Sequence, residues 1–385
     1  MRLAIVVSHP IQYYAPWFSY LTSNTSIHIK VFYLWDYGIS ETYDRDFQQN
    51  ISWKIQLLEG YDYELLKNTS KSPGTHHFFG LENPDLIEIL ADFSPQAILL
   101  FGYYSYTHLR LLTSARLKKI PKIFRGDSHC LLSGYRSWLR SFFIRKILSK
   151  YDAALYVGKA NKEYLIKHGF KEQNIFFSPH AVNQAHFFPD ENSRLETRKK
   201  LGIKNEEIAL FFVGKFEPKK CPVLLAKLFL DITNPNLRLF YVGSGPLQRE
   251  LERISEAHKR IIIVGFVDQT EMPSIYRAAD YVILPSFGPK ETWGFCIQEA
   301  MCCGAAVICS THVGCAYDLI TQGENGFIFP AGDWNSLKRI LEGLPSEQSY
   351  SRTMGKRGLE KMKFFNYSVA TKGLLSSLEY LIHEK

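Results

Sequence analysis

Two separate series of short apolar segments, each alternating with helix-forming segments, constrain the fold of this 385-residue chain most strongly. Such alternation is typical of strand–helix–strand units, which build parallel sheets. The expected strands are residues 3–7, 29–34, 97–101, 122–124 and 153–157 in the first series, and 208–213, 237–242, 261–264, 281–284, 306–308 and 326–329 in the second. A charged stretch around residues 184–205 separates the two series. We therefore expect two doubly wound α/β domains.

Composition narrows the class of protein. The chain is too long for one core of ordinary size, and its 46% hydrophobic and 22% charged residues are typical of a globular protein. Apolar runs stay well short of the ~20 residues that a membrane span requires. Residues 1–7 continue directly into Ser8-His9-Pro10, which indicates a buried strand rather than a signal peptide, so we expect a cytoplasmic protein.

The net charge and the cysteine content argue against a nucleic-acid-binding protein and against a metal site. The net charge of +8 suits an acidic substrate, an anionic membrane surface or a nucleic acid. Nucleic acid is disfavoured, because the chain has no long basic block and no zinc-finger spacing. Five of the seven cysteines lie within residues 296–315, and none forms a C-x-x-C pair, so we expect free thiols and no metal site.

Residues 290–301 carry the strongest chemical signal. Glu291 and Glu299 stand eight positions apart with Gly294 between them, behind an apolar strand and a Phe287-Gly288-Pro289 turn. A helix that begins at Gly294 directs its first-turn N–H groups and its positive dipole end at an anion such as phosphate. Beside that phosphate, Glu291 can accept hydrogen bonds from sugar hydroxyls and Glu299 can reach a ribose. The segment therefore predicts a nucleotide-sugar site.

The same segment resembles the E-x7-E signature of the retaining family-4 glycosyltransferases, also called glycosyl transferases group 1. The resemblance continues through residues 299–304, 307–310, 313–315, 318–320 and 323–330. It implies a GT-B fold, in which two Rossmann-like domains face each other across a cleft. We accordingly expect an acceptor-binding domain at 1–190, a nucleotide-sugar-binding domain at 191–365, and a C-terminal helix at 366–385 that returns to the first domain.

The resemblance also implies donor contacts in the second domain. A glycine–cation pair and a nearby lysine of the family correspond to Gly214, Lys215 and Lys220, whose charges would stabilise the leaving diphosphate. Taken alone, these lysines also fit a solvated basic loop. The implied donor-binding residues are Gly214, Lys215, Lys220, Gly243, Val267, Thr292, Trp293, Gly294, Phe295 and Glu299, with Glu291 as a catalytic residue.

In the first domain, the loop after the first strand reads His-Pro-Ile-Gln-Tyr from His9, as in a bacterial subgroup of the family. His9 and Gln12 are predicted on the acceptor side, and a packing role for His9 is the alternative. The family usually places a histidine beside the reacting carbon, near the present Arg125-Gly126-Asp127-Ser128-His129. Asp127 and His129 both compete for that catalytic position, and Arg125 is predicted to line the acceptor side.

Two other segments leave alternatives open. Residues 135–150 are basic and aromatic, so they fit either peripheral contact with the inner face of an anionic membrane or packing in the core. Asp44-Arg45-Asp46 has the D-x-D spacing of metal-dependent transferases of another fold. We read that spacing as chance, because cationic side chains make a metal unnecessary, and we expect neither metal nor other cofactor.

The resemblance thus implies a retaining glycosyltransferase that moves a sugar from a nucleotide diphosphate to a hydroxyl of a glycan or lipid-linked acceptor, in surface polysaccharide or glycolipid synthesis. A phosphorylase or an epimerase would keep the fold, but residues 291–330 disfavour an epimerase. A non-catalytic nucleotide-sugar or glycan-binding protein is the main alternative. The sequence does not distinguish UDP, GDP and ADP donors, and it does not identify the acceptor, the linkage or the oligomeric state.

Overall fold

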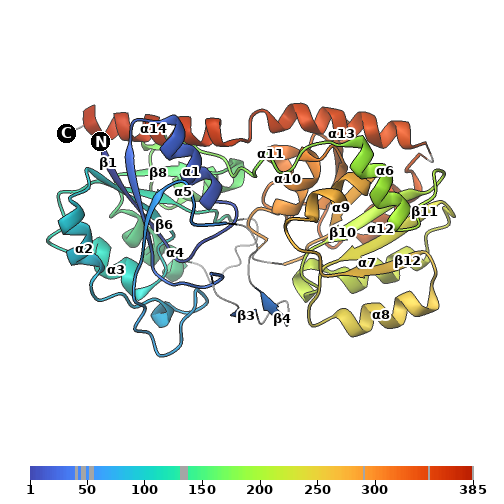
Figure 1. Ribbon diagram of the computed structural model, residues 1–385, viewed down its shortest axis with the longest axis horizontal. Coiled ribbons are helices and arrows are strands. Elements are labelled where there is room, and N and C mark those ends of the chain that lie inside the picture. Colours follow the sequence, from blue (N-terminus) through green and yellow to red (C-terminus); the bar gives the residue numbers. More distant parts are fainter. Residues whose placement is uncertain are drawn as a thin grey trace. The chain divides into compact units, whose positions relative to one another are not determined.

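The computed structural model of the protein describes residues 1–39, 42–44, 49–51, 56–130, 138–288, 291–345 and 347–383. The chain divides into two compact units. Unit 1 comprises Met1–Thr42, Ile51–Ala181 and Tyr367–Lys385, and unit 2 comprises Tyr43–Asn50 and Val182–Asn366. The division between Ala181 and Val182 lies before the boundary expected at residues 190 and 191. Figure 1 labels many of the helices and strands of both units.

Unit 1 is built on a seven-stranded parallel sheet of order β5-β2-β1-β6-β7-β8-β9. Its elements are β1 (Arg2–Val7), α1 (Ala15–Asn24), β2 (His28–Tyr33), β5 (Asp62–Leu65), η1 (Phe78–Gly80), α2 (Leu86–Phe93), β6 (Ala97–Phe101), α3 (Tyr106–Thr113), β7 (Lys122–Arg125), α4 (Trp138–Leu148), β8 (Ala153–Tyr156), α5 (Lys159–Lys167), η3 (Glu172–Asn174), β9 (Ile175–Phe177) and α14 (Tyr367–His383).

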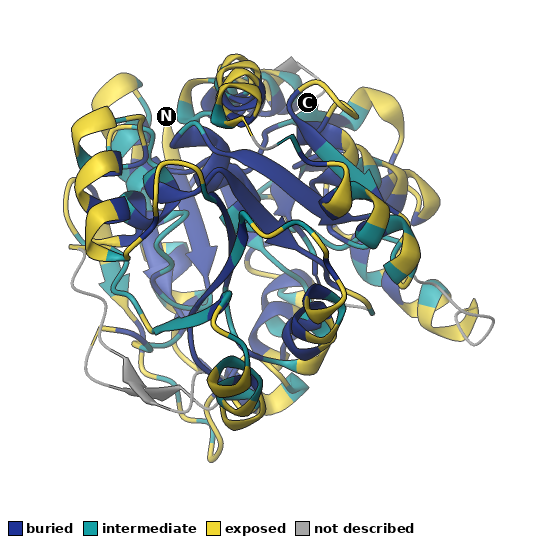
Figure 2. Ribbon diagram, turned by 90° about the vertical axis from the view of Figure 1, so that its right-hand side faces the viewer, coloured by how far each residue is buried: buried dark blue, intermediate teal, exposed yellow. Residues whose placement is uncertain are grey.

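Both faces of this sheet are buried, as expected for parallel strands covered by helices. Alternate residues of β1 enter different cores: Leu3 and Ile5 pack in one, and Ala4 and Val6 in the other. Figure 2 shows strands of the protein largely in dark blue, whereas the helices carry many yellow, exposed residues. The fully apolar strands of the sequence are thus explained by burial on two sides.

The C-terminal helix α14 packs on unit 1. Trp17 of α1 donates its indole N–H to Thr371 Oγ1 at 3.0 Å, and Ser178 donates to the Ala370 carbonyl oxygen at 2.8 Å. Leu374 and Leu378 join the same core as β1 and α1. Residues from the two ends of the chain therefore form one hydrophobic core.

Unit 2 contains a six-stranded parallel sheet of order β12-β11-β10-β13-β14-β15. Its elements are α6 (Glu191–Lys200), β10 (Ile208–Val213), η4 (Pro218–Lys220), α7 (Pro222–Leu230), β11 (Leu237–Val242), α8 (Gln248–Ala257), β12 (Ile261–Gly265), α9 (Met272–Ala278), β13 (Tyr281–Leu284), α10 (Phe295–Cys302), β14 (Ala306–Ser310), α11 (Ala316–Leu319), β15 (Gly326–Phe329), α12 (Trp334–Glu342) and α13 (Gln348–Met362). A short ribbon pairs β3 (Thr42–Asp44) with β4 (Gln49–Ile51).

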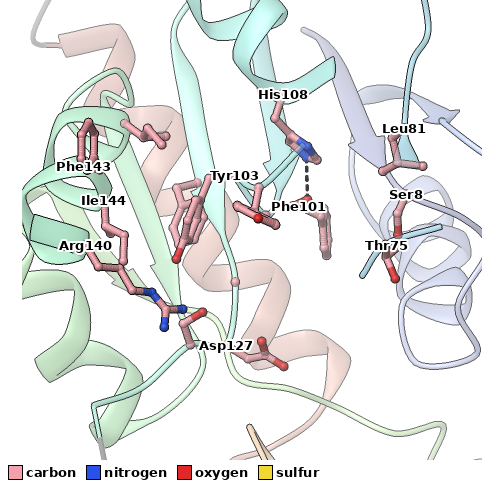
Figure 3. Close-up of a pocket in the computed structure, with 16 residues that line it drawn as sticks. Ser8, Thr75, Leu81, Phe101, Tyr103, His108, Asp127, Arg140, Phe143 and Ile144 are labelled. Atoms are coloured by element: carbon pink, nitrogen blue, oxygen red, sulfur yellow. Dashed lines mark hydrogen bonds between the residues drawn. The ribbon is translucent and has the colours of Figure 1, made fainter. Parts of the chain in front are cut away.

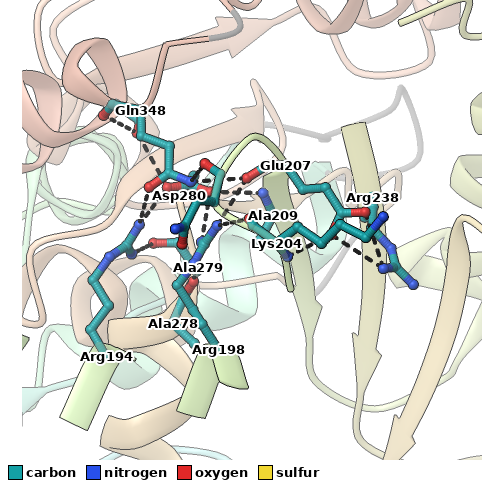
Figure 4. Close-up of polar contacts among 12 residues, drawn as sticks. Arg194, Arg198, Lys204, Glu207, Ala209, Arg238, Ala278, Ala279, Asp280 and Gln348 are labelled. Carbon is teal, nitrogen blue, oxygen red and sulfur yellow. Dashed lines mark hydrogen bonds and ion pairs between the residues drawn. The ribbon is translucent and has the colours of Figure 1, made fainter. Parts of the chain in front are cut away.

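A buried ionic cluster holds the amino-terminal edge of the unit 2 sheet together (Figure 4). Asp280, directly before β13, accepts hydrogen bonds from Arg194 at 2.6 Å and Arg198 at 2.9 Å, both of α6. It also accepts from the backbone N–H of Ala209 in β10 at 2.8 Å. The cluster attaches α6 to the sheet, and it lies at the edge opposite the carboxyl ends of the strands.

Every strand expected from the sequence is present, with end shifts of a few residues, but the short β3–β4 ribbon and the two edge strands β5 and β9 were not predicted. β5 is an edge strand whose residues are mostly exposed, so it lacks an apolar run. β9 is the other edge strand and has only three residues. Short or solvated edge strands carry little hydrophobic signal, which explains the omission of β5 and β9.

Candidate functional site

The strand order of unit 2 reverses direction at β10. From β10 the chain adds β11 and β12 on one side, and then returns to place β13 on the other side of β10. Phe212 of β10 pairs with Tyr241 of β11 and with Ile283 of β13, so the three carboxyl ends are aligned. Loops that leave such a reversal point diverge and create a crevice, where open α/β sheets bind ligands.

Glycines allow the loops after β10 and β11 to approach closely. Gly214 and Gly243 have φ values of +142° and +137°. A Cβ at Gly243 would lie 2.0 Å from the Gly214 carbonyl oxygen. The N–H of Gly214 donates to Val242, and that of Gly243 donates to Gly265 at the end of β12. Hydrogen bonds therefore connect the adjacent backbones at this edge, with no side chain between them. A loop that binds phosphate through its backbone requires such a close approach.

A largely buried ion pair connects the loops on the two sides of the reversal. Lys220, at the end of η4 after β10, donates from Nζ to Glu291 Oε2 at 2.8 Å. Ser286, after β13, donates to the same oxygen at 3.1 Å. Burial alone would raise the pKa of Glu291, but the Lys220 charge and these hydrogen bonds hold it below its usual range. The pair therefore consists of a carboxylate and an ammonium group.

The backbone that carries Glu291 is fastened to the loop after β14. The N–H of Gly314 donates to the Glu291 carbonyl oxygen at 3.1 Å, and that of Cys315 donates to Trp293 at 2.9 Å. A Cβ at position 314 would lie 1.9 Å from the Thr292 carbonyl oxygen, so only glycine fits there. The buried Trp293 indole donates to Gln298 at 2.9 Å. These contacts fix residues 291–293 directly before α10.

The helix α10 begins at this point. Gly294 is its N-cap residue with φ of +95°, and a Cβ there would lie 2.6 Å from Val313 Cγ1. Phe295 and Cys296 form the first turn and are half-buried. The positive end of the helix dipole therefore lies beside the Lys220–Glu291 pair, an arrangement that favours an anion. Pro289 and Lys290, which the sequence places in the preceding turn, lie outside the described residues.

Glu299 is held from two sides within α10. Tyr276 of α9 donates its hydroxyl to Glu299 Oε2 at 2.6 Å, and Gln269 donates its amide to Oε1 at 3.1 Å. His186 Nε2 in turn lies 3.0 Å from the Gln269 carbonyl oxygen. The carboxylate is buried, and a single rotamer satisfies both donors. Neither Tyr276 nor Gln269 was predicted, because they belong to another helix and loop and carry no recognisable motif.

The other predicted donor residues lie around the same edge. Lys215 follows Gly214 directly after β10, and Val267 follows the end of β12; both are half-buried. The thiol of Cys296 lies close enough to Lys220 and Glu291 to feel their charges, but burial dominates and raises its pKa to about 12. This thiol is protonated at neutral pH, so it is no nucleophile in this state.

Unit 1 contains a pocket of about 700 Å³ at the carboxyl ends of β6 and β7 (Figure 3). The described residues that line it are Ser8, Thr75, Leu81, Phe101, Gly102, Tyr103, Tyr104, His108, Phe124, Gly126, Asp127, Ser128, Arg140, Phe143, Ile144 and Ile147. Asp127 is thus on the pocket wall, and its Oδ2 lies 3.7 Å from Nε2 of the buried His180. His129, its predicted competitor, is half-buried and outside this lining.

Arg125 lies in the core of unit 1 rather than on the pocket wall. It donates to the carbonyl and hydroxyl oxygens of Ser178 at 2.9 and 2.8 Å, and its guanidinium carbon lies 4.7 Å from the ring centre of Trp17. It is 2% exposed, and burial lowers its pKa to about 10. These contacts assign Arg125 to the support of the segment after β9, a role that the sequence did not indicate.

The His9 loop is packed by aromatic rings. His9 lies edge-on to Trp35 and Tyr37, at ring-centre distances of 6.0 and 5.3 Å, and its Nδ1 lies 3.0 Å from Ser8 Oγ. Burial lowers its pKa to about 4, so its ring is neutral at pH 7. The buried Oε1 of Gln12 has no hydrogen-bond partner among the described residues. A contact of either residue with an acceptor stays a prediction.

Two segments fall partly outside the described residues. Arg45 and Asp46 of the Asp44-Arg45-Asp46 run are not described, nor are residues 135–137 of the basic aromatic stretch. Within the described parts of the chain, no cluster of three or more His, Cys, Asp or Glu side chains could hold a metal ion. None of the described helices is long and apolar enough to cross a membrane.

Comparison with known protein families finds a match within unit 2. The family model for glycosyl transferases group 1 matches residues 193–361. The D-inositol 3-phosphate glycosyltransferase of Kribbella flavida is 27% identical over 195 residues, which are 47% of this chain and 45% of that protein. The N-acetyl-alpha-D-glucosaminyl L-malate synthase of Bacillus anthracis is 24% identical over 208 residues, 53% of this chain and 50% of that one. The chain thus spans about half the length of these curated relatives.

Solved structures resemble the whole chain. HepE of Anabaena in complex with UDP has a TM-score of 0.75 at 16% identity, covering 99% of this chain and 100% of that one. Sucrose-phosphate synthase of Thermosynechococcus elongatus has a TM-score of 0.74 at 19% identity and covers 100% of both chains. The fold is therefore GT-B, with two parallel-sheet Rossmann-like α/β domains, and this confirms the predicted fold class.

Proposed function

We propose that the protein is a glycosyltransferase that transfers a sugar from a nucleoside diphosphate to an acceptor hydroxyl with retention of configuration. One observation carries this proposal: the largely buried Lys220–Glu291 pair stands at the reversal point of the unit 2 sheet, with Glu291 directly before α10. The pair belongs to the region that matches the glycosyl transferases group 1 model. A cation, a carboxylate and a helix N-terminus together suit a sugar joined to a diphosphate.

In this proposal each group has a separate task. Lys220 and Lys215 contact the diphosphate, together with the backbone amides of residues 292–295. Glu291 accepts hydrogen bonds from hydroxyls of the donor sugar, and Glu299 accepts them from the ribose. Because the charge of a leaving diphosphate grows as the glycosidic bond breaks, a cation already fixed in place lowers the barrier without reorganisation. No metal is required for this role.

The ionisation of the pair supports the assignment. Burial would lower the pKa of Lys220, but the nearby Glu291 carboxylate outweighs burial and raises it above 10.5. Lys220 is therefore cationic at every physiological pH. When the donor binds, Lys220 gives up its contact with Glu291. The diphosphate compensates for this loss, because it supplies Lys220 with a new anionic partner.

The similar proteins support the same class of donor. Two further HepE structures hold UDP with glucose and UDP-glucose, and two curated relatives are named as a D-inositol 3-phosphate glycosyltransferase and an N-acetyl-alpha-D-glucosaminyl L-malate synthase. For this chain we propose an acceptor hydroxyl on a glycan or lipid-linked molecule, in surface polysaccharide or glycolipid synthesis in the cytoplasm. Departure of the diphosphate and attack of the acceptor on the same face would retain the anomeric configuration without a protein nucleophile.

The proposal is tested by turnover. Purified protein is supplied with UDP-, GDP- or ADP-glucose and a total lipid and glycan extract, and release of the nucleoside diphosphate is measured beside Lys220→Gln. We expect release from one donor, a loss of about 100-fold in Lys220→Gln, and little change in Lys227→Gln, which removes an exposed lysine paired with Glu250. Anomeric configuration of the product is read by NMR.

The alternative, a non-catalytic GT-B protein, predicts a different result. Such a protein would bind a sugar nucleotide saturably but release no diphosphate above background with any extract. Equal turnover by the parent protein and Lys220→Gln would instead show that the reaction does not use the proposed site.

A further inference from the structure

We propose that the unit 1 pocket binds the acceptor and that this acceptor is an anionic amphiphile, in which an apolar chain is joined through a phosphate to the group that receives the sugar. This inference rests on the proposed function and deepens it by naming the class of acceptor. The pocket volume of about 700 Å³ lies in the range of small-molecule sites.

The pocket wall is mainly apolar. Phe101 and Phe124 come from the ends of β6 and β7, and Phe143, Ile144 and Ile147 come from one side of α4. Leu81 and Tyr103 complete the apolar surface, and the Tyr103 hydroxyl is already bonded to Tyr164 at 2.8 Å. Burying a hydrocarbon chain against such a wall is favourable because apolar surface leaves water. A bare glycan would leave most of this wall unused.

Two of the polar residues that line the pocket, Arg140 and Asp127, carry opposite charges. Arg140 extends from α4 toward the side of the pocket where Asp127 lies (Figure 3). His108 also lines the pocket, but its ring nitrogens lie 2.5 Å from Ser105 Oγ and 3.0 Å from the Phe101 carbonyl oxygen. Its burial lowers its pKa to about 4, so the ring is neutral. Arg140 can therefore bind a phosphate, and Asp127 can accept a hydrogen bond from a hydroxyl.

The surface of α4 beside the pocket continues the same pattern. Bulky apolar side chains of this helix are exposed, although Ile144 and Leu148 of the same helix are buried. The exposed members are Trp138, Leu139, Phe142 and Phe143. The helix contains three basic residues and no acidic one. Charge and apolar surface thus coincide, which complements a molecule that has both an anionic group and a hydrocarbon chain.

The experiment uses decyl phosphate, below its critical micelle concentration, as the probe of the full-length protein in isothermal titration calorimetry. Two pairs of matched variants distinguish binding in the pocket from binding to the rest of the α4 surface. Phe143 and Phe142 are 61% and 59% exposed neighbours, but of the two only Phe143 lines the pocket among the described residues. Likewise Arg140 lines the pocket and the exposed Arg145 of the same helix does not.

We expect saturable binding of one decyl phosphate, weakened roughly tenfold by Phe143→Ser and by Arg140→Gln, and nearly unchanged by Phe142→Ser and Arg145→Gln. Nucleotide binding should be the same in all four variants. A pocket that does not bind the amphiphile can therefore be distinguished from a donor site that does not bind the nucleotide. Circular dichroism confirms that each variant is folded.

Three results would overturn the inference. If both variants of each matched pair lost the same affinity for decyl phosphate, the probe would be adsorbing to the helix surface, as in contact with a membrane. Equal binding of decyl phosphate and glucose 1-phosphate would show that the hydrocarbon chain does not use the pocket, in favour of a glycan acceptor. Absence of saturable binding in the parent protein would show that the pocket does not take amphiphiles.

Discussion

At the residue scale, Glu299 receives hydrogen bonds from Tyr276 and Gln269, so its orientation is set before any nucleotide binds. We expect Tyr276→Phe to weaken nucleotide binding about tenfold, because a hydrogen bond to a charged group contributes ~1.5–3 kcal/mol. Isothermal titration measures this loss. Tyr281→Phe is the matched control, since the buried Tyr281 hydroxyl makes no hydrogen bond with the described residues. Equal affinity in the parent and in Tyr276→Phe would contradict a positioning role.

The Lys220–Glu291 pair predicts a pH dependence of stability. The folded-state pKa of Glu291 is below 4.5, so its contribution is present above the unfolded pKa and is lost as the pH falls through the folded value. The folded-state pKa of Lys220 is above 10.5, so its contribution is lost only as the pH rises through that value. Between 4.5 and 10.5 the pair stays charged.

We therefore expect Glu291→Gln to lose less stability than the parent when the pH is lowered below 4.5. Urea unfolding at a series of pH values measures this difference. Glu342→Gln serves as the control, because Glu342 is partly exposed and lies 3.9 Å from Lys338. Parallel pH profiles for the parent protein and Glu291→Gln would show that the carboxyl has no depressed pKa.

At the scale of elements, the loop after β14 supports the segment that leads into α10. Gly314→Ala would place a Cβ 1.9 Å from the Thr292 carbonyl oxygen and displace residues 291–293. We expect nucleotide affinity to fall at least tenfold, since both Glu291 and the start of α10 would move. Gly358→Ala is the control, because the nearest side-chain atom to its Cβ would be Met301 Cε at 3.4 Å, the end of a flexible side chain. Unchanged affinity in Gly314→Ala would refute this dependence.

We expect the cluster around Asp280 to contribute to the stability of the protein and not to nucleotide binding. Asp280→Ala leaves the Arg194 and Arg198 guanidinium groups without their carboxylate, and breaking a buried ion pair from one side costs about 3–5 kcal/mol. We expect this loss in the free energy of urea unfolding, with nucleotide affinity of the folded protein unchanged. The reason is that the cluster lies at the opposite edge of the sheet from Lys220 and Glu291. A selective loss of affinity without loss of stability would contradict this separation.

At the scale of the whole molecule, the apolar strands were predictable because burial on both faces leaves uninterrupted runs of hydrophobic residues. The edge strands β5 and β9 were not, since exposure and shortness remove that signal. Glu291 and Gly294 were singled out by one continuous segment, and Lys220 by the family resemblance of the separate segment 214–220. Tyr276 and Gln269 reach Glu299 from distant positions in the chain, and the burial of Arg125 depends on Ser178, so spacing along the sequence could not indicate them.

We propose that a nucleoside diphosphate binds at the carboxyl edge of the unit 2 sheet, between β10 and β13. Isothermal titration with UDP, GDP and ADP, in the absence of metal, tests it most directly beside Lys220→Gln and Glu299→Ala. We predict saturable binding of one nucleotide and a loss of at least about tenfold in each variant. Failure of all three nucleotides to bind, or equal affinity in the parent protein and both variants, would show that this edge of the sheet holds no such nucleotide site.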